Sequence, residues 1–130
     1  MSYISNGSAK GYYPPKARAM ANEIESPVCK HFQRAAELLG KRWNPQLVRV
    51  LLSGAVRYSD LKAGVPQISD HLLSERLKEL EAEGIVTREV TPSTPVRIEY
   101  LLTERGHDLA GVIGELADWA ERWTDAPATR

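Results

Sequence analysis

The apolar residues of this 130-residue chain change their spacing at Ile85. Before that point they recur every three or four residues, which is the spacing of amphipathic helices. Ile85–Val90 is short and rich in β-branched residues, and Arg97–Leu102 alternates in polarity, with Ile98, Tyr100 and Leu102 pointing one way, so both segments read as strands. The prolines of Thr91–Pro95 cannot continue a strand. The sequence therefore predicts a set of helices followed by a two-stranded hairpin.

Start and stop signals divide the helical part of the chain. Ser26-Pro27 and Asn44-Pro45 each pair a capping residue with a proline at the first helical position, and the helices that follow should end at Gly40 and Gly54. We expect the apolar stripe of the first of these helices to be Phe32, Ala35, Ala36 and Leu39. A short helix is expected from Ser59 to just before Gly64, followed by a turn over residues 64–67. Ser69 should then cap a longer helix, 70–83, with Leu73, Leu77 and Leu80 on its buried face, and Thr103 should cap a last helix, 104–123.

A short helix, a tight turn and a second helix form a helix-turn-helix, and a hairpin behind them makes it winged. The expected fold class is therefore mainly α with a small β-hairpin (α+β). We expect a flexible N-terminal arm with a possible short helix over 1–25, a winged-helix domain over 26–123 and a disordered tail over 124–130.

Composition sets wide limits on function. The hydrophobic content of 42% and charged content of 26% are ordinary, and neither a membrane span nor a secretory leader is visible, so a cytoplasmic protein without a membrane partner is expected. The formal net charge of zero does not indicate nucleic acid by itself. Residues 29–62 nevertheless carry seven Lys or Arg against two acids, whereas residues 104–122 carry five acids against two basic residues. One part of the chain could therefore face phosphates.

The exposed face of the helix at 70–83 is the candidate for reading base edges in the major groove. Its candidates for base edges, together with the cap, are Ser69, Asp70, His71, Ser74 and Glu75, and Lys78 on the same face is the candidate for phosphate. Backbone contacts are expected from the hairpin tip at Ser93, Thr94 and Arg97 and from Arg76, although Arg76 could equally pair with an acid inside the domain. Any surface helix shows a polar outer face, and winged helices also bind proteins. An exposed basic surface on Lys62, Arg76 and Arg97 would favour DNA.

Several motifs follow one another at fixed spacing. They are Leu-Leu-Gly-Lys-Arg-Trp-Asn (38–44), Arg-Tyr-Ser-Asp-Leu (57–61), Ile68-Ser69, Leu-Leu-Ser-Glu-Arg-Leu-Lys-Glu-Leu-Glu (72–81), Gly-Ile-Val-Thr-Arg (84–88), Pro-Val-Arg-Ile-Glu-Tyr (95–100) and Leu-Thr-Glu (102–104). From about Cys29 to Trp123 the chain resembles the HxlR family of bacterial transcription regulators, relatives of MarR-type proteins. The resemblance implies that the helix at 69–83 lies in the major groove and that the wing at 91–97 contacts the flanking backbone. Arg57 and Ser59, in the second motif, join the expected backbone contacts.

The resemblance also implies a homodimer, a repressor in the simplest case, on a pseudo-palindromic double-stranded operator, with the terminal helices forming the dimer contact. The last helix fits this role, because it carries more apolar surface than one small core needs. Its expected contact residues are Leu109, Val112, Ile113, Leu116, Trp119 and Trp123. In the simpler alternative both tryptophans only cover their own domain.

Cys29 is the chain's one cysteine, so an intrachain disulfide is impossible. It is expected in the first turn of a helix, next to Lys30 and His31, and both conditions favour a reactive thiolate. A lone cysteine is more often a small apolar filler. A branch of the resembled family consists of redox and electrophile sensors with a cysteine at this place. The resemblance implies that Cys29 is such a sensor, acting through a bond between subunits, a mixed disulfide or an adduct.

Three other functions compete with this one. An enzyme is not expected, since no nucleophile signature or phosphate loop is present, and His31, His71 and His107 lack the spacing of metal ligands, so neither a metal nor a cofactor is expected. A winged helix that binds only protein is the second alternative. In the third, a small aromatic ligand is the effector and Cys29 is structural.

Overall fold

The computed structural model describes residues 28–124, and the chain divides into two compact units, 1–39 and 40–130. The predicted arm over 1–25 and the helix start at Ser26-Pro27 lie outside the described residues, as does the predicted tail from residue 125 onward. Thr124, placed in that tail by the sequence, is the last residue of a helix instead.

The described part of the first unit is Val28, Cys29 and helix α2 (Lys30–Gly40) as far as Leu39. The helix ends at Gly40 as predicted. Its apolar stripe is left largely uncovered: α2 has no buried residue, and the side chain of Phe32 is 63% exposed.

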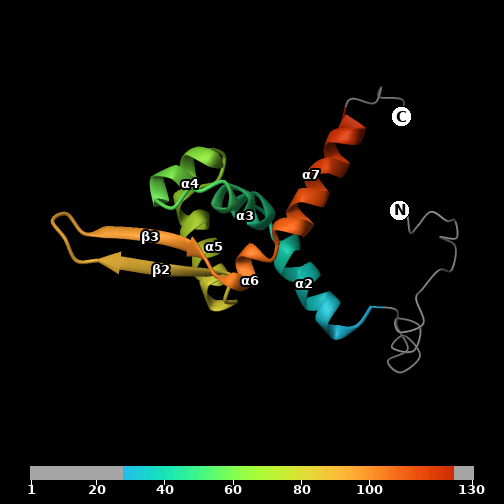
Figure 1. The fold of residues 1–130 in the computed structure, drawn as a ribbon, viewed down its shortest axis with the longest axis horizontal. Coiled ribbons are helices and arrows are strands. Elements are labelled where there is room, and N and C mark those ends of the chain that lie inside the picture. The colour runs from blue at the N-terminus through green and yellow to red at the C-terminus, as the bar shows by residue number, and fades with distance from the viewer. Residues whose placement is uncertain (1–27, 125–130) are drawn as a thin grey trace, which may run out of the picture. The chain divides into compact units, whose positions relative to one another are not determined.

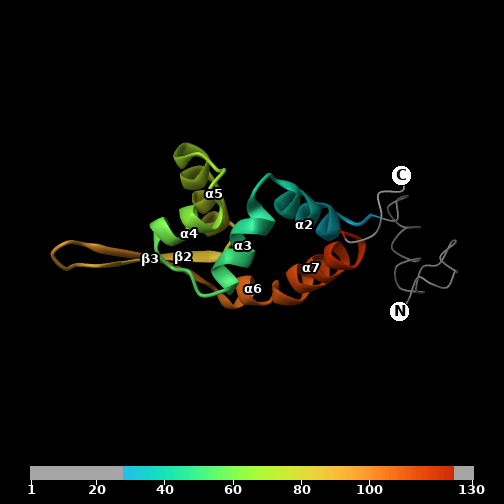
Figure 2. The same cartoon turned by 90° about the horizontal axis from the view of Figure 1, so that it is seen from above.

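The second unit holds a three-helix cluster, a hairpin and a C-terminal helical pair (Figure 1). In chain order these are α3 (Asn44–Leu52), α4 (Tyr58–Gly64), α5 (Asp70–Ala82), β2 (Val86–Thr91), β3 (Arg97–Leu102), α6 (Glu104–His107) and α7 (Ala110–Thr124). The predicted mainly helical class with one hairpin is confirmed. Seen from above, the hairpin reaches past the helices to which its base is attached (Figure 2).

The core of this unit lies where α3, α4, α5 and the start of β2 meet. Helices α3 and α5 contribute residues spaced at three and four, because only that spacing keeps side chains on one face. The fully or nearly buried members are Leu47, Val48 and Leu51 of α3, Leu61 of α4, Leu73, Leu77 and Leu80 of α5, and Val65, Ile68, Ile85 and Val86 between and beside them.

The hairpin is antiparallel, with Val86 opposite Leu102 and Thr91 opposite Arg97. Alternation places Val86, which is buried, on the same face as Arg88 and its cross-strand partner Tyr100. The opposite face carries Glu89 and Glu99, which also lie opposite each other. The backbone N–H of Tyr100 donates to the carbonyl of Val56 at 2.8 Å, so the loop between α3 and α4 anchors β3.

The predicted single last helix, 104–123, is wrong in one respect: it is two helices, α6 and α7, separated at Asp108 and Leu109. Thr103 caps α6 as predicted, accepting from the backbone N–H of Gly106 at 3.0 Å. A Cβ on Gly106 would overlap the carbonyl oxygen of Ile85, so the backbone of α6 is pressed against the base of the hairpin. The contact between Gly106 and Ile85 fixes the position of α6. After the turn at residues 108 and 109, α7 runs in a different direction.

Candidate DNA-binding surface

Helix α5 begins where the sequence predicted, because Ser69 caps it. The Ser69 hydroxyl accepts from the backbone N–H of Leu72 at 3.1 Å, and Ser69 itself has extended backbone angles. The cap satisfies one of the free N–H groups of the first turn and fixes where the helix starts. The predicted buried face is confirmed, since Leu73, Leu77 and Leu80 are at most 2% exposed.

The opposite face of α5 is polar and open to solvent. His71, Ser74 and Lys78 are exposed, and Glu75 is half-buried beside them. Hydroxyl and imidazole groups can donate to or accept from base edges, and an ammonium group can donate to base edges and to phosphate oxygens. The structure thus brings these four sequence-predicted residues onto one surface.

Asp70 is engaged with the preceding helix. The hydroxyl of Tyr58, on α4, donates to the backbone carbonyl of Asp70 at 3.1 Å and lies 3.4 Å from its Oδ1. Lys62 of α4 also donates to the backbone carbonyl of Ile68 in the turn. These contacts set the angle between the two helices of the helix-turn-helix. The sequence indicated neither contact, because each joins residues whose approach depends on the turn.

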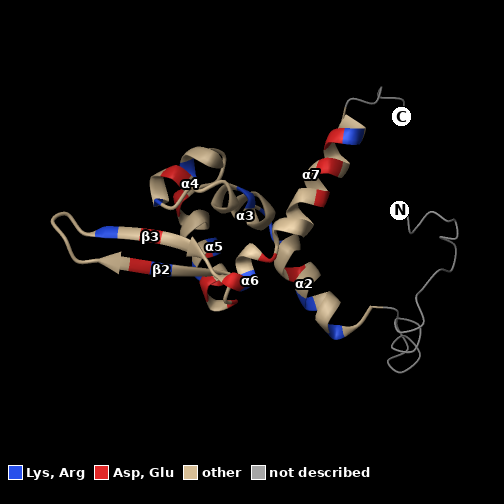
Figure 3. Cartoon of the chain, in the orientation of Figure 1, with Lys and Arg blue, Asp and Glu red and all other residues tan. Residues whose placement is uncertain are grey.

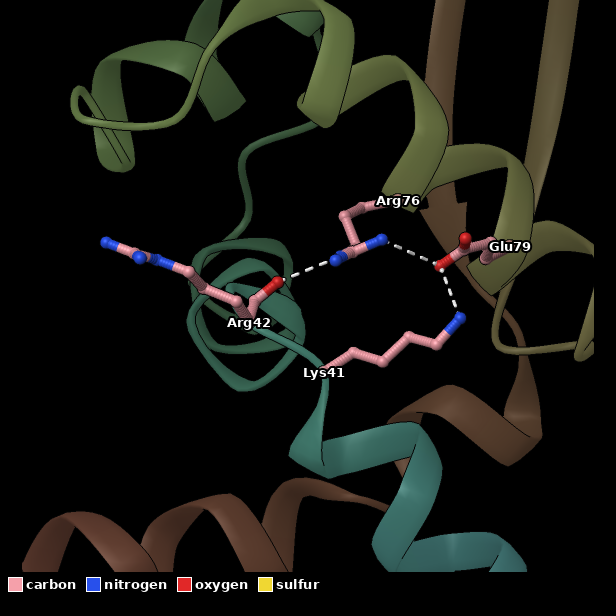
Figure 4. A network of polar contacts seen from close by, with 4 residues as sticks. All are labelled: Lys41, Arg42, Arg76 and Glu79. Carbon is pink, nitrogen blue, oxygen red and sulfur yellow. Dashed lines mark hydrogen bonds and ion pairs between the residues drawn. The ribbon is translucent and has the colours of Figure 1, made fainter.

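Arg76 takes part in a polar network that joins α5 to the segment before α3 (Figure 4). Its Nε donates to the carbonyl of Arg42 at 2.9 Å, and its Nη1 lies 3.1 Å from Oε1 of Glu79. The same oxygen pairs with Nζ of Lys41 at 3.3 Å. The Arg76 side chain is only 16% exposed. The alternative role that the sequence left open, pairing with an acid inside the domain, is therefore present, and a phosphate contact through Arg76 stays a prediction.

The hairpin tip is held by its own contacts. The hydroxyl of Ser93 donates to the carbonyl of Pro95 at 2.6 Å, and Thr94 is exposed. Arg97 is exposed and lies 4.0 Å from a carboxylate oxygen of Glu99. In the first helix of the helix-turn-helix, Arg57 occupies the cap position of α4 and Ser59 lies in the first turn. Both residues are exposed.

Of Lys62, Arg76 and Arg97, whose exposure would favour DNA, only Arg97 is exposed in this structure. Lys62 and Arg76 donate to backbone carbonyls, and Arg97 lies beside a carboxylate. The exposed basic residues next to the open face of α5 are Lys78 and Arg88, and the sequence pattern did not indicate the second of these. Only the strand register reveals it, because Arg88 reaches this side through its pairing position opposite Tyr100.

Helix α7 carries five of the six residues predicted for dimerisation, and Leu109 lies in the turn just before it. Ile113 is buried inside the unit and Leu109 is half-buried, whereas Val112, Leu116, Trp119 and Trp123 are 50–62% exposed. Acidic residues recur along the same helix (Figure 3). A shallow apolar groove of about 210 Å³ runs between α3 and α7, lined by Pro45, Gln46, Arg49, Ile113, Leu116, Ala117 and Ala120.

Cys29 lies just before α2. The sequence predicted it one step further on, in the first turn of the helix. Its carbonyl accepts from the N–H of Gln33 at 2.9 Å, and its Sγ lies 3.4 Å from the backbone nitrogen of Phe32, which donates to it. The sulfur thus occupies the position that a capping oxygen normally takes. The thiol is partly exposed.

Among residues 28–124, no cluster of three or more His, Cys, Asp or Glu side chains is placed to hold a metal ion. Nor does any helix within that range combine the length and apolar character needed to cross a bilayer.

A capped helix with an open polar face, held against a shorter helix and followed by a hairpin, defines a winged helix-turn-helix protein. The model of the HxlR-like helix-turn-helix family matches residues 38–128, and the chain belongs to that family. It is a DNA-binding transcriptional regulator and not an enzyme.

Two relatives from Bacillus subtilis show how far the likeness extends. The HTH-type transcriptional regulator YvaP is 50% identical over 101 residues, covering 78% of this chain and 94% of YvaP. The HTH-type transcriptional regulator YodB is 43% identical over 98 residues, covering 75% of this chain and 88% of YodB.

Solved structures confirm the winged helix-turn-helix fold. The reduced form of YodB superposes with a TM-score of 0.67 at 43% identity, covering 75% of this chain and 95% of YodB. Quinone-bound YodB superposes with a TM-score of 0.63 at 40% identity, covering 73% of this chain and 99% of YodB. The redox regulator HypR in its oxidised form superposes with a TM-score of 0.66 at 32% identity, covering 69% of this chain and 93% of HypR.

Proposed function

We propose that the chain is a homodimeric repressor that binds a pseudo-palindromic operator and releases it when Cys29 is oxidised or modified by an electrophile. The observation that carries the DNA part is the two-sided character of α5. Its leucines are buried, while His71, Ser74 and Lys78 point to solvent from a helix whose start is fixed by Ser69. Such a helix presents a rigid polar edge to the major groove.

The hairpin and α4 supply the proposed backbone contacts. Ser93, Thr94 and Arg97 lie at or next to the hairpin tip, and Arg57 and Ser59 are exposed at the start of α4. Contacts of this kind fix the register of a protein on the duplex without reading its sequence.

The dimer is supported by the exposed apolar side chains of α7. Val112, Leu116, Trp119 and Trp123 are each at least half exposed in the single chain. An apolar row of this kind is uncommon on a monomer and typical of an interface core. Two copies would also provide the two half-sites that a palindrome requires.

The thiol switch is supported by the position of Cys29 and by the relatives. The sulfur is partly exposed and accepts the N–H of Phe32. YodB has been solved in reduced, diamide-treated and quinone-bound forms, and HypR is a redox regulator. Because Cys29 is the chain's one cysteine, oxidation would join it to Cys29 of a second copy or to a small thiol, and a quinone would add to the sulfur directly.

A small non-covalent effector is the second candidate. The apolar groove between α3 and α7 has a volume of about 210 Å³. Ligand pockets for drug-sized molecules are usually larger, on the order of 300–1,000 Å³. The groove between α3 and α7 is therefore smaller than the usual site for such a ligand.

The test is a gel shift with DNA from upstream of the chain's own and neighbouring genes, using wild-type and Cys29→Ser protein, each reduced, diamide-treated and quinone-treated. We expect a shift with reduced wild type, its loss after either treatment, and an unchanged shift for Cys29→Ser. If Cys29→Ser also releases DNA after treatment, the switch is not at Cys29. If neither protein shifts any of this DNA, the DNA-binding proposal fails.

A further inference from the structure

A notch of about 370 Å³ lies between α5 and the hairpin, at the end of the surface already described. It is lined by Ser74, Leu77, Lys78 and Glu81 of α5, Arg88 of β2 and Tyr100 of β3. Helix α5 packs on β2, so the two walls of the notch belong to one packed assembly. The notch opens beside Ser74 and Lys78, which the proposed function assigns to DNA.

Two cations from different elements share this notch. Lys78 and Arg88 are both exposed, and no ion pair or hydrogen bond of either side chain is found among the described residues. This separates them from Lys62 and Arg76, which already donate inside the domain. The hydroxyl groups of Ser74 and Tyr100 add neutral donors to the same lining.

The hairpin register explains why Arg88 points to this side. Arg88 shares a strand face with the buried Val86 and lies opposite Tyr100. Both hairpin carboxylates, Glu89 and Glu99, lie on the other face, where Arg97 accompanies Glu99. Within the paired strands, the face that turns toward α5 therefore carries Arg88 as its one charged side chain.

We propose that Lys78 and Arg88 hold one phosphate of the DNA backbone in the notch between α5 and the hairpin. This inference rests on the proposed DNA binding and adds a contact that it does not contain. An arginine matches the geometry of phosphate with two parallel N–H donors, and a lysine adds a point charge. One phosphate held from both the helix and the wing fixes how deeply α5 enters the groove. Arg88 is thus a positioning residue for base reading.

Glu81 places a carboxylate in the lining of the same notch. A phosphate bound there would be repelled by Glu81. Replacing the carboxylate by an amide should therefore strengthen binding to DNA, an effect that a purely structural notch would not produce.

The experiment measures the affinity of the full chain for a short labelled duplex of mixed sequence as a function of salt. For Arg88→Gln we expect the slope of log affinity against log salt to fall by about 0.9 for each phosphate that the protein ceases to neutralise. Affinity at fixed salt should fall roughly tenfold. Arg88→Lys should keep most of the slope, and Glu81→Gln should raise affinity. Arg122→Gln, on α7, removes the same charge elsewhere and should leave the slope unchanged.

A second arm locates the phosphate. On an operator fragment that wild type binds, neutral methylphosphonates are placed singly along the backbone. One position per half-site should weaken wild type most, and its effect should be smaller on Arg88→Gln, in which only Lys78 still contacts that phosphate. Thermal melting of each variant confirms folding. If Arg88→Gln unfolds, Arg88→Lys and Glu81→Gln carry the test.

Failure of this inference can be told apart from failure of the proposed function. If wild type binds no duplex, the proposed function falls and this inference with it. If wild type binds but Arg88→Gln keeps its full slope, only the inference is overturned. The same holds if Arg97→Gln lowers the slope in place of Arg88→Gln, because the wing would then use its opposite face. A reduction that is equal at every methylphosphonate position would likewise exclude a single phosphate.

Discussion

One carboxylate oxygen of Glu79 pairs with Nη1 of Arg76 at 3.1 Å and with Nζ of Lys41 at 3.3 Å. Arg76 also donates to the carbonyl of Arg42, so the network ties the middle of α5 to the two residues that precede Trp43. Trp43 has a positive φ of 81°, an uncommon conformation for a residue other than glycine. The network holds this turn and α5 together at a point remote from the exposed face of α5.

Glu79→Gln should remove the charge from this network and lower the free energy of unfolding by roughly 1 kcal/mol, since the Arg76 side of the pair is mostly buried and the Lys41 side is exposed. Urea denaturation measures the change. Glu115→Gln, on the exposed surface of α7, is the control and should change stability by less than about 0.5 kcal/mol. Equal stability of the two variants would show that the network contributes nothing.

Ser69 can be tested separately as a cap and as part of the DNA-binding surface. Ser69→Ala removes the acceptor for the N–H of Leu72 and should cost about 1 kcal/mol. Ser69→Asp keeps a capping oxygen and should preserve stability, yet its negative charge should weaken DNA binding. Denaturation and fluorescence anisotropy on the same samples measure both. Unweakened DNA binding by Ser69→Asp would place Ser69 away from the duplex.

Gly106→Ala should destabilise the chain by about 2 kcal/mol, because its Cβ would overlap the carbonyl oxygen of Ile85 and force the backbone to move. Gly114→Ala is the matched control: a Cβ there meets no atom within 4 Å, and alanine favours a helix over glycine by about 1 kcal/mol. The two substitutions should therefore shift the melting temperature in opposite directions. A stabilising Gly106→Ala would contradict the close contact.

Trp119→Glu should weaken the proposed dimer roughly 30-fold, equivalent to about 2 kcal/mol, by placing a charge in an apolar interface. The fold should survive, since the side chain is 56% exposed in the single chain. Sedimentation velocity over a range of concentrations measures the dissociation constant. Arg122→Glu introduces the same charge next to Asp118 and Glu121, outside the apolar row, and should leave the dimer intact. A monomeric wild type would refute the dimer itself.

Features determined by nearby residues were predictable from the sequence. The Ser69 cap, the buried spacing of Leu73, Leu77 and Leu80, and the pairing of the two strands all follow from local pattern, and the structure has each of them. The last helix was harder, because its break depends on Gly106 meeting Ile85, 21 residues earlier in the chain. No local signal reports that contact.

The candidate site divides in the same way. The helical period of α5 predicted which of its residues face outward, and His71, Ser74 and Lys78 are indeed exposed. Which cations are already engaged was not predictable: Arg76 could be matched to Glu79 from their spacing, but its bond to the Arg42 carbonyl depends on tertiary packing. Arg88 was missed because an alternating strand reveals two faces without saying which one meets α5.

The hairpin register has one more consequence. Because side chains alternate, sliding one strand past the other by a single residue would exchange its faces. A one-residue insertion before Arg88 would send that guanidinium outward and bring a carboxylate toward α5, whereas a two-residue insertion would preserve the arrangement. Insertions of an even number of residues can therefore lengthen the wing while leaving the charge that faces α5 unchanged. An odd step reverses the sign of the charge beside α5, and gaps of odd length in this strand should be rare among functional relatives.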